Sequence, residues 1–439
     1  MRIHFFTLND IEDYRKNYSN YALTQKLVKT SKAQSKEDFD QELFYNFITK
    51  TYNVPGGIFE SRIWGDTGFP GLRLDFNFGL RLDIPEGNFR VKISDFDSDK
   101  VVFDKYISGG RLLSVEQYFI RWQVEVFLDE QKIFDHTLNL EGQPVAIMCK
   151  FNALGDTIAF LPYFREFQKY HRCKLMLCLP DFISEFAKQL YPDIEQIDEV
   201  NFNTYATYYP MMTVSPFPVV PVDVRHMSLN RVGGMLFGID YIPPKAIFKP
   251  TSPPVTNEPY VCIGIQGSNV RKGWLYPNGW DIVVDYLKRR GYRVFCIDRY
   301  KTMTQHGYTI SMPEGAEDFT GNRPILERAN MLYHAKFFIG LSSGLAWIAE
   351  AVNCPVVMIT GFTLDWHEFY TPYRVSNRHG CNGCLNDMRV DYFNPKIPCP
   401  YHNETPRELE CQKNILPRKV IETIERLIAD RSLTSPALR

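Results

Sequence analysis

Short apolar strands alternate with amphipathic helices in two separate parts of this 439-residue chain. The expected elements are strands at 145–149 and 174–179 with a helix at 180–190, then strands at 260–265 and 292–297 around a helix at 278–290. This alternation is typical of parallel sheets that carry helices on both faces. We therefore predict an α/β protein with two Rossmann-like domains, 143–245 and 246–439, joined by a proline-rich linker. Their strand carboxyl ends are expected to face one cleft, where ligands of such folds bind.

Residues 56–142 follow a different pattern, in which the period is two residues. From Leu72 to Ile84 apolar residues alternate with polar ones, which predicts a strand with one solvated face. Further strands are expected near 89–93 and 118–128. We therefore predict an antiparallel β module over 56–142. Residues 1–55 are polar and are expected to form an N-terminal extension with a helix near 37–52.

Charge and hydropathy argue against several classes of protein. The formal net charge is −1, so the chain lacks the basic surface with which proteins displace counterions from nucleic acid. The first residues turn polar too early for a signal peptide, and we expect a cytoplasmic protein. Residues 337–362 carry a single formal charge, Glu350, and are long enough to cross a bilayer. Their glycines, serines and prolines instead predict a strand, a turn, a helix and a strand.

Gly155 and Asp156 lie between the first strand of the first α/β domain and the helix that follows. Glycine permits a sharp turn and a close approach of a substrate to the backbone. An aspartate at this point could cap the helix by accepting hydrogen bonds from its free N–H groups. It could equally serve as a general base for an attacking hydroxyl group. The residues alone leave both roles open.

Two segments of the second α/β domain are suited to phosphate. Residues 267–274 follow its first strand and include Arg271 and Lys272, two cations that could bind a diphosphate or simply face solvent. Residues 342–347 join a strand to a helix, and small residues at a helix start present N–H groups to an anion. A tight structural turn is the alternative for this second segment.

Four cysteines follow, with the spacing Cys381-x2-Cys384-x14-Cys399-x11-Cys411. Four soft ligands and a Cys-x2-Cys pair suit one tetrahedral ion, and four thiolates would saturate it, so such a site is structural rather than catalytic. Zinc and iron both suit these ligands. Disulfides are not expected in a reducing cytoplasm. We predict a metal insert at 380–412, with four unrelated buried cysteines as the alternative.

The order of these segments resembles the ADP-heptose glycosyltransferases of glycosyltransferase family nine. The matching segments are Ala153–Asp156, Gly267–Trp274, Asp318–Gly321, Ser343–Leu345 and Cys354–Val357, followed by Gly361. The resemblance implies a GT-B-type cleft enzyme with an inverting displacement that needs no catalytic metal. It also implies the site residues, namely Asp156 as catalytic base, Gly267, Lys272, Asp298, Ser342, Ser343, Gly344 and Leu345 around the donor, and Asn152, Leu154, Gly155 and Trp347 on the acceptor side of the cleft.

The chain departs from the pattern of the lipopolysaccharide enzymes at one point. Those enzymes usually show Asp-Thr-Gly-Leu-x-His where this chain has Ser-Ser-Gly-Leu-Ala-Trp at 342–347. The usual acid and histidine are therefore missing, and a different acceptor is one explanation.

Taken together, the α/β core, the β module and the four-cysteine insert are similar to the bacterial autotransporter heptosyltransferases. Members of that family transfer heptose from ADP-heptose to serine hydroxyl groups of autotransporter adhesin passengers in the cytoplasm. The resemblance further implies iron at the four cysteines and a ring-like homo-oligomer, expected to be a dodecamer. A transferase for another nucleotide sugar or for a glycan acceptor, and a non-catalytic scaffold protein, are the alternatives.

Overall fold

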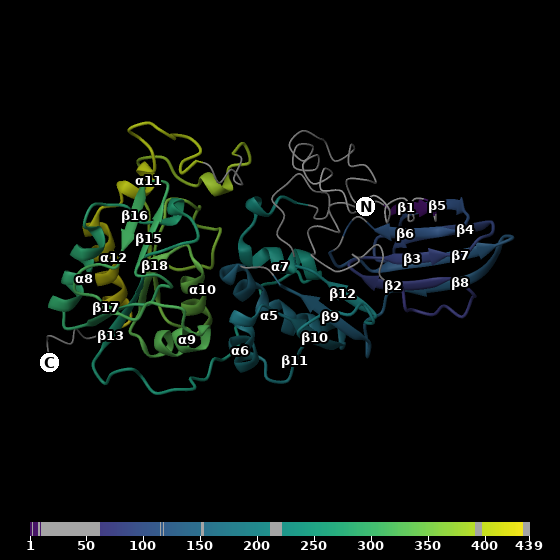
Figure 1. The fold of residues 1–439 in the computed structure, drawn as a ribbon, viewed down its shortest axis with the longest axis horizontal. Helices are drawn as coiled ribbons and strands as arrows, with labels where there is room; N and C mark the ends of the chain where they lie inside the picture. Colours follow the sequence, from purple (N-terminus) through teal and green to yellow (C-terminus); the bar gives the residue numbers. More distant parts are fainter. Residues whose placement is uncertain are drawn as a thin grey trace.

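The computed structural model describes residues 62–114, 116, 118–150, 153–210, 222–390 and 397–432, together with Met1, residues 3–7 and Asn9. The helix expected near 37–52 lies outside these residues. The described chain forms two α/β lobes side by side, and a β-rich part continues from the first lobe (Figure 1). Among the described helices, none combines the length and the hydropathy that crossing a lipid bilayer requires.

The second lobe contains a six-stranded sheet in which all the strands are parallel. Its strands, in spatial order, are β17 (Glu317–Asp318), β14 (Arg293–Cys296), β13 (Tyr260–Gly264), β18 (Phe338–Leu341), β19 (Val356–Ile359) and β20 (Arg374–Val375). Helices α8 (Gly279–Arg289) and α12 (Pro417–Asp430) cover one face of the sheet, and α9 (Ile325–His334) and α10 (Gly344–Ala351) cover the other (Figure 1). The predicted strand, turn, helix and strand at 337–362 are confirmed as β18, α10 and β19.

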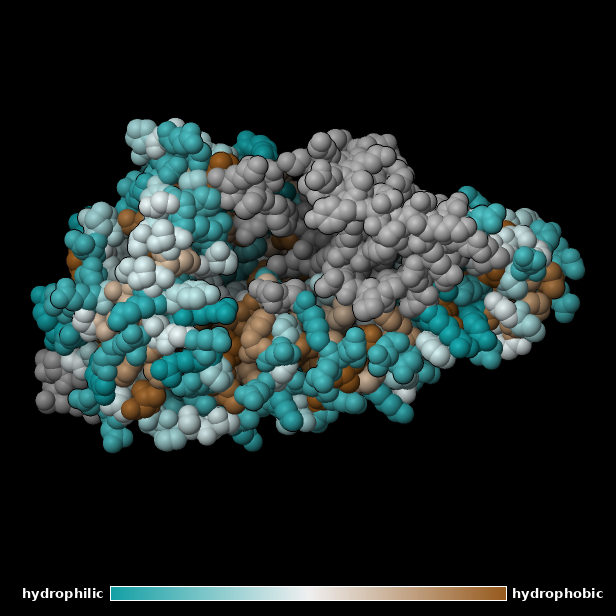
Figure 2. Space-filling view, in the orientation of Figure 1, coloured by the Kyte–Doolittle hydropathy of each residue, from teal (hydrophilic) through white to brown (hydrophobic). Residues whose placement is uncertain are grey.

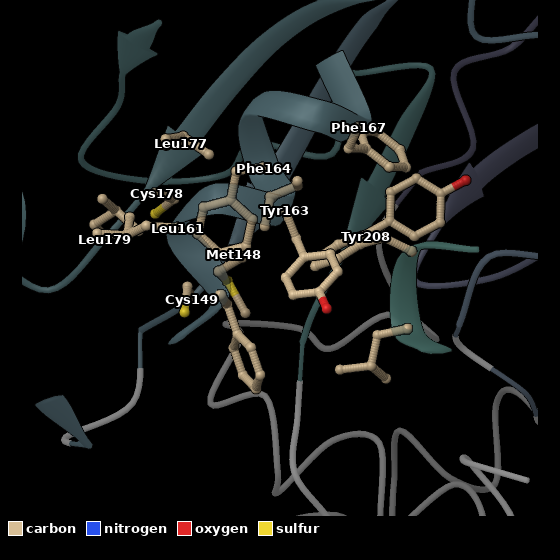
Figure 3. Close-up of a cluster of buried hydrophobic side chains, with 14 of the residues drawn as sticks. Met148, Cys149, Leu161, Tyr163, Phe164, Phe167, Leu177, Cys178, Leu179 and Tyr208 are labelled. Atoms are coloured by element: carbon tan, nitrogen blue, oxygen red, sulfur yellow. The ribbon is translucent and has the colours of Figure 1, made fainter. Parts of the chain in front are cut away.

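The first lobe is built on four parallel strands, β12 (Ala206–Tyr208), β9 (Pro144–Met148), β10 (Lys174–Cys178) and β11 (Glu195–Gln196). Helix α5 (Leu154–His171) lies against this sheet, and the side chains of Leu161, Phe164 and Phe167 gather with those of Leu177 and Tyr208 in one apolar cluster (Figure 3). Helices α6 (Asp181–Leu190) and α7 (Leu229–Phe237) complete the lobe. The aromatic face of α5 thus holds the helix firmly in place.

The sheet of the first lobe continues into the β-rich part. Strand β2 (Arg73–Asn77) pairs in parallel with β12, and β3 (Arg81–Ile84), β6 (Gly110–Ser114) and β1 (Ile3–Thr7) follow as antiparallel neighbours. The expected boundary at 142/143 therefore lies within one eight-stranded mixed sheet. A separate four-stranded antiparallel sheet contains β5 (Lys100–Ile107), β4 (Phe89–Asp95), β7 (Trp122–Leu128) and β8 (Gln131–Thr137).

The alternating stretch from Leu72 to Ile84 is a hairpin, so the prediction of one strand with a solvated face was wrong. Phe78 and Gly79 adopt positive φ angles of 59° and 88° and reverse the chain between β2 and β3. Three of the polar residues of the stretch, Asp75, Asn77 and Arg81, are buried because they bond one another or the neighbouring strand. Arg81 donates to both carboxylate oxygens of Asp75, at 2.7 and 2.6 Å.

Asn77 ties the β-rich part to the first lobe. Its side-chain amide donates to the carbonyl of Thr204 at 2.9 Å, and its side-chain oxygen accepts from the hydroxyl groups of Thr204 and Thr207 at 2.8 and 2.6 Å. All of these groups are buried. Because buried polar groups are costly when unpaired, this network favours a single register between β2 and β12.

The two lobes are connected by residues 238–259, which run without regular helix or strand and contain the predicted proline-rich linker, residues 243–254. Several of its large apolar side chains are exposed, among them Tyr241, Ile242, Ile247 and Val255. On the side shown in Figure 2, hydrophilic residues cover most of the described surface and hydrophobic ones gather toward its middle.

The buried ion pair between Arg81 and Asp75 leads to a prediction about stability. Removing the guanidinium in Arg81→Met leaves an ionised carboxylate buried without its partner, and we expect a loss of about 3–5 kcal/mol in unfolding free energy. Arg90→Met is the matched control, because Arg90 forms the same bidentate ion pair with Asp104 at the surface. This substitution should change the unfolding free energy little. Urea unfolding of the three proteins measures this, and equal losses in the two variants would contradict it.

Candidate active site

The amino-terminal ends of α5 and α10 touch where the two lobes meet. Each helix begins just after the carboxyl end of a parallel strand, α5 after β9 and α10 after β18. A Cβ atom at Gly344 would lie 2.8 Å from the Leu154 side chain, and one at Gly155 would lie 2.9 Å from Cδ1 of Trp347. Glycine at these two positions therefore lets the helices approach. The structure thus brings together four of the predicted site residues.

Trp347 occupies the space that glycine leaves at position 155. Its side chain is buried and packs edge to face on Phe369, with ring centroids 5.0 Å apart. The sequence predicts that Gly155 lets a substrate approach the backbone, but the structure places the indole ring there. The close approach at Gly155 therefore serves the contact between the lobes.

Asp156 is the third residue of α5 and lies in its first turn, whereas Ala153 is the N-cap residue. Of the two roles left open for Asp156, that of the N-cap residue therefore does not apply. Burial raises the pKa of its carboxyl group to about 6, although the positive charge of Lys272 acts in the opposite direction. The side chain keeps some contact with solvent. An acid from the first lobe and a base from the second thus lie close enough to interact.

Lys272 ends a short 3-10 turn, η2 (Val270–Lys272), that follows β13. A Cβ atom at Gly267 would lie 2.8 Å from Cβ of Lys272, so the glycine makes room for the lysine. Burial lowers the pKa of Lys272, while the negative charges of Asp156 and Glu368 raise it. Its ammonium group lies 5.8 Å from the ring centroid of Phe362. The backbone at Gly267 and the side chain of Lys272, both predicted site residues, are therefore packed against each other.

Glu368 is a site residue that sequence reasoning missed. It is buried, and its carboxylate lies 2.8 Å from Arg374 and accepts a hydrogen bond from the Ser342 hydroxyl group. Burial raises the pKa of Glu368, but the charges of Arg374 and His367 and the bond from Ser342 outweigh it, so the pKa is lowered. The sequence does not connect the two residues, because the burial of Ser342, which implies a hydrogen-bond partner, is known only from the structure.

The four predicted residues at the start of α10 take different roles. Ser342 is bound to Glu368, and Leu345 is buried beneath β13, where a Cβ atom at Gly264 would lie 3.0 Å from it. Ser343 is the N-cap residue, and within the described chain its buried hydroxyl oxygen has no hydrogen-bond partner. Ser343 and the helix start at Gly344 are thus the groups placed to receive an anion.

Asp298 holds strand ends together. Its two carboxylate oxygens accept from the backbone N–H groups of Ile265 and Gln266 at 2.7 and 3.2 Å, and its side chain is 2% exposed. Burial raises its pKa to about 6. The buried guanidinium of Arg328 donates to the carbonyls of Ile297 and Asp298 beside it. This structural role was not foreseen, and a ribose contact stays a prediction. Asn152, predicted for the acceptor side, lies outside the described residues.

The four predicted metal ligands gather beside the second lobe. Cys384, Cys399 and Cys411 are buried, Cys381 is partly exposed, and all four are free thiols. Burial raises the pKa of Cys384 to about 12, and the neighbouring thiols of Cys381 and Cys399 add to this effect. Within the described residues, however, no group of three or more His, Cys, Asp or Glu side chains is arranged to hold a metal ion. The thiols are neighbours, but they do not form a ligand cage.

The groups at the junction of the lobes are suited to proton transfer and to anion binding. A carboxyl group with a pKa near 6 is largely ionised at neutral pH and still basic enough to accept a proton during attack. Lys272, Ser343 and the start of α10 together offer positive charge and hydrogen-bond donors to an anion. The junction can therefore activate a hydroxyl group and stabilise a phosphate.

Comparison with known proteins gives related sequences over most of the chain. A family model described as "Glycosyltransferase TibC, N-terminal domain" matches residues 68–130. Autotransporter heptosyltransferase TibC of Escherichia coli O78:H11 is 38% identical over 376 residues, which cover 82% of this chain and 90% of TibC. Autotransporter heptosyltransferase BAHTCr of Citrobacter rodentium is 38% identical over 378 residues, with the same coverage.

Two further comparisons bear on function. The crystal structure of the dodecameric iron-containing heptosyltransferase TibC in complex with ADP-D-beta-D-heptose superimposes with a TM-score of 0.78 and 39% identity, covering 83% of this chain and 96% of that one. BimC of Burkholderia thailandensis, described as an inactive autotransporter heptosyltransferase, is 31% identical and covers 82% of this chain and 86% of its own length.

The raised pKa of Asp156 predicts a pH-dependent difference in stability. Between the usual aspartate pKa of 3.8 and about 6, the unfolded chain has lost the proton while the folded chain keeps it, so folding stability falls as pH rises. Asp156→Asn cannot titrate, and its stability relative to the native protein should grow by about 3 kcal/mol across this range and then level off. Melting temperatures from pH 4 to 8 measure it, and a constant difference would contradict it.

Proposed function

The chain belongs to the autotransporter heptosyltransferase family, and on this basis we propose that it is an inverting glycosyltransferase that moves heptose from ADP-heptose to serine hydroxyl groups of an autotransporter adhesin passenger in the cytoplasm. The observation that carries the proposal is the approach of Asp156 to Lys272 across the junction of the lobes. The chain also covers 90% of TibC, which has been crystallised with ADP-heptose.

In this reaction Asp156 is the general base. A serine hydroxyl group is too weakly acidic to ionise beforehand, so a base must take its proton as the oxygen attacks the anomeric carbon. The new carbon–oxygen bond forms as the bond to the diphosphate breaks on the opposite side of the sugar, which inverts the configuration at that carbon. The proton ends on the carboxylate of Asp156, and ADP leaves with the bonding electrons.

The second lobe stabilises the leaving diphosphate. Lys272 supplies a positive charge, and Ser343 and the N–H groups at Gly344 supply hydrogen-bond donors. Because these groups provide the positive potential, the proposal includes no catalytic metal. On the acceptor side, Leu154, Gly155 and Trp347 would act by holding the two lobes together, because they pack against one another and Gly344. A ribose contact by Asp298 would require its carboxylate to exchange a backbone hydrogen bond for the ligand.

We further propose that the four cysteines hold one structural metal ion and that the chain assembles as a dodecamer. The support is that the four thiols are neighbours and that the related TibC is described as iron-containing and dodecameric. Because the described side chains do not form a ligand cage, metal binding would have to draw the four thiols closer together. Four thiolates would complete a tetrahedral shell, so the ion would stabilise the insert and leave no position for a substrate. Iron is the first choice and zinc the second.

One alternative has a specific observation in its favour. The relative BimC is described as inactive, so a chain of this family can lack transfer activity. A non-catalytic scaffold would keep the fold and the assembly without needing the acid at position 156. Transfer experiments therefore decide between the two functions.

The first test of the proposed function is Asp156→Asn, which keeps the size of the side chain but cannot accept a proton. We expect transfer to fall by about 10²–10⁴-fold, while ADP binding persists because Lys272 and Ser343 are unchanged. Intact-mass spectrometry of an autotransporter passenger co-expressed with each protein, in cells that make ADP-heptose, measures the heptose additions.

Asp181→Asn is the matched control, because Asp181 also lies in the first turn of a helix of the same lobe but is exposed. It should add heptose as the native protein does. Near-normal transfer by Asp156→Asn would refute the role of the base. An unmodified passenger with the native protein, when donor supply is confirmed, would favour the scaffold or another donor.

The metal proposal is tested with Cys381→Ser combined with Cys384→Ser. Loss of two of four ligands should remove the ion, lower the melting temperature and disturb assembly, because a structural ion contributes directly to folding. Elemental analysis, melting curves and size-exclusion chromatography measure these effects. Cys354→Ser is a control, since Cys354 is buried outside the insert. An unchanged melting curve and elution volume after metal loss would contradict a structural ion.

A further inference from the structure

We infer that the four-cysteine insert, residues 380–412, sets the shape of the proposed donor-phosphate site, and that Arg271 is the main positioning residue through which it acts. The inference rests on the proposed function for the identity of the ligand. Its structural basis is a set of buried hydrogen bonds between the insert and the two loops around Lys272.

Arg271 and Lys272 are neighbours in the loop after β13 and have different surroundings. Lys272 interacts with Asp156 of the first lobe, whereas the side chain of Arg271 lies against the insert and is 2% exposed. Its guanidinium donates to the carbonyls of Ile397 and Pro398, at 2.6 and 3.2 Å. These carbonyls come directly before Cys399. The planar guanidinium can bond two acceptors at once, so it fixes the loop to the backbone at that cysteine.

A second cysteine of the insert has a neighbour that holds the backbone of the same loop. Gln412, beside Cys411, is fully buried, and its side-chain amide donates to the carbonyl of Arg271 at 2.6 Å. The backbone carbonyl of Gln412 accepts a hydrogen bond from the N–H group of Leu275 at 3.2 Å. Residues 271–275 are thus held at both ends, and Lys272 lies within this held segment.

The insert also holds the loop on the other side of Lys272. The N–H groups of Gly383 and Leu385 donate to the carbonyls of Gly361 and Phe362, at 2.8 and 3.2 Å. The Asn386 side chain accepts from the N–H group of Leu364 at 2.9 Å and lies 3.1 Å from Nδ1 of His367. This loop carries Phe362, which lies near the ammonium group of Lys272, and it leads to Glu368.

Both loops therefore depend on the insert for their conformation. A Cβ atom at Gly361 would lie 2.6 Å from the carbonyl oxygen of Cys411, which shows how closely the insert and the loop are packed. A loop held in its binding conformation before the ligand arrives pays less conformational entropy on binding. The insert thus contributes to donor affinity without touching the donor.

The test is Arg271→Lys in the purified full-length protein. Lysine keeps the charge, but its single ammonium group cannot reproduce the two-pronged contact. We expect ADP to bind about tenfold more weakly by calorimetry, a change of about 1.4 kcal/mol. We also expect hydrogen–deuterium exchange to accelerate in peptides that cover 266–276, with β9 and α5 unchanged.

Arg389→Lys is the matched control, because it makes the same substitution in the insert itself, where the Arg389 side chain is 85% exposed. It should bind ADP and exchange as the native protein does. If Arg271→Lys does not fold, Asn386→Ala takes its place, with faster exchange expected over 361–368.

Three results would overturn the inference. The first is that a folded Arg271→Lys protein shows the hydrogen–deuterium exchange and the ADP affinity of the native protein. The second is that exchange in this variant increases uniformly across both lobes. The third is that Arg389→Lys weakens ADP binding and accelerates exchange as much as Arg271→Lys does. If the native protein does not bind ADP, the proposed function fails, and the exchange measurements still decide whether the insert positions the loops.

Discussion

The contact between the first turns of α5 and α10 is the constraint on which the rest of the site depends. Each turn uses a glycine to admit a side chain from the other lobe, so that Trp347 lies over Gly155 and Leu154 over Gly344. Because α5 starts at the end of β9 and α10 at the end of β18, this contact brings the carboxyl ends of both parallel sheets together. Asp156 and Lys272 meet as a consequence, although 115 positions separate them in the sequence.

The charges at the junction are held in low-dielectric surroundings, and each is balanced by a partner. Burial raises the pKa of Asp156 and lowers that of Lys272, so it favours the neutral form of each residue. The charge of each residue reduces the shift of the other. Glu368 stays ionised because Arg374 and Ser342 surround its carboxylate. The site therefore combines Asp156, which can take up a proton near neutral pH, with Lys272, whose positive charge interacts with the carboxylates of Asp156 and Glu368. The insert fixes the two loops that carry Lys272 and Glu368.

Local patterns predicted the regular elements well and the side-chain roles less well. The strand and helix spans of both lobes followed from apolar runs and helix starts, because short-range sterics and burial decide them. The prediction for residues 72–84 was wrong for two reasons. A period of two does not show that Phe78 and Gly79 reverse the chain. It also does not show that Asp75 and Arg81 form an ion pair inside the protein. Glu368 escaped notice because its partner Ser342 is on another loop.

The two α/β repeats, the candidate base and lysine, and the spacing of four cysteines could all be recognised from neighbouring residues in the chain. The folded structure was needed to show that β2 extends the sheet of the first lobe, that Ser342 and Asp298 are bound by other protein groups, and that the insert holds the loops around Lys272. These facts depend on hydrogen bonds between residues far apart in the chain, and their geometry exists only after both lobes have folded and packed.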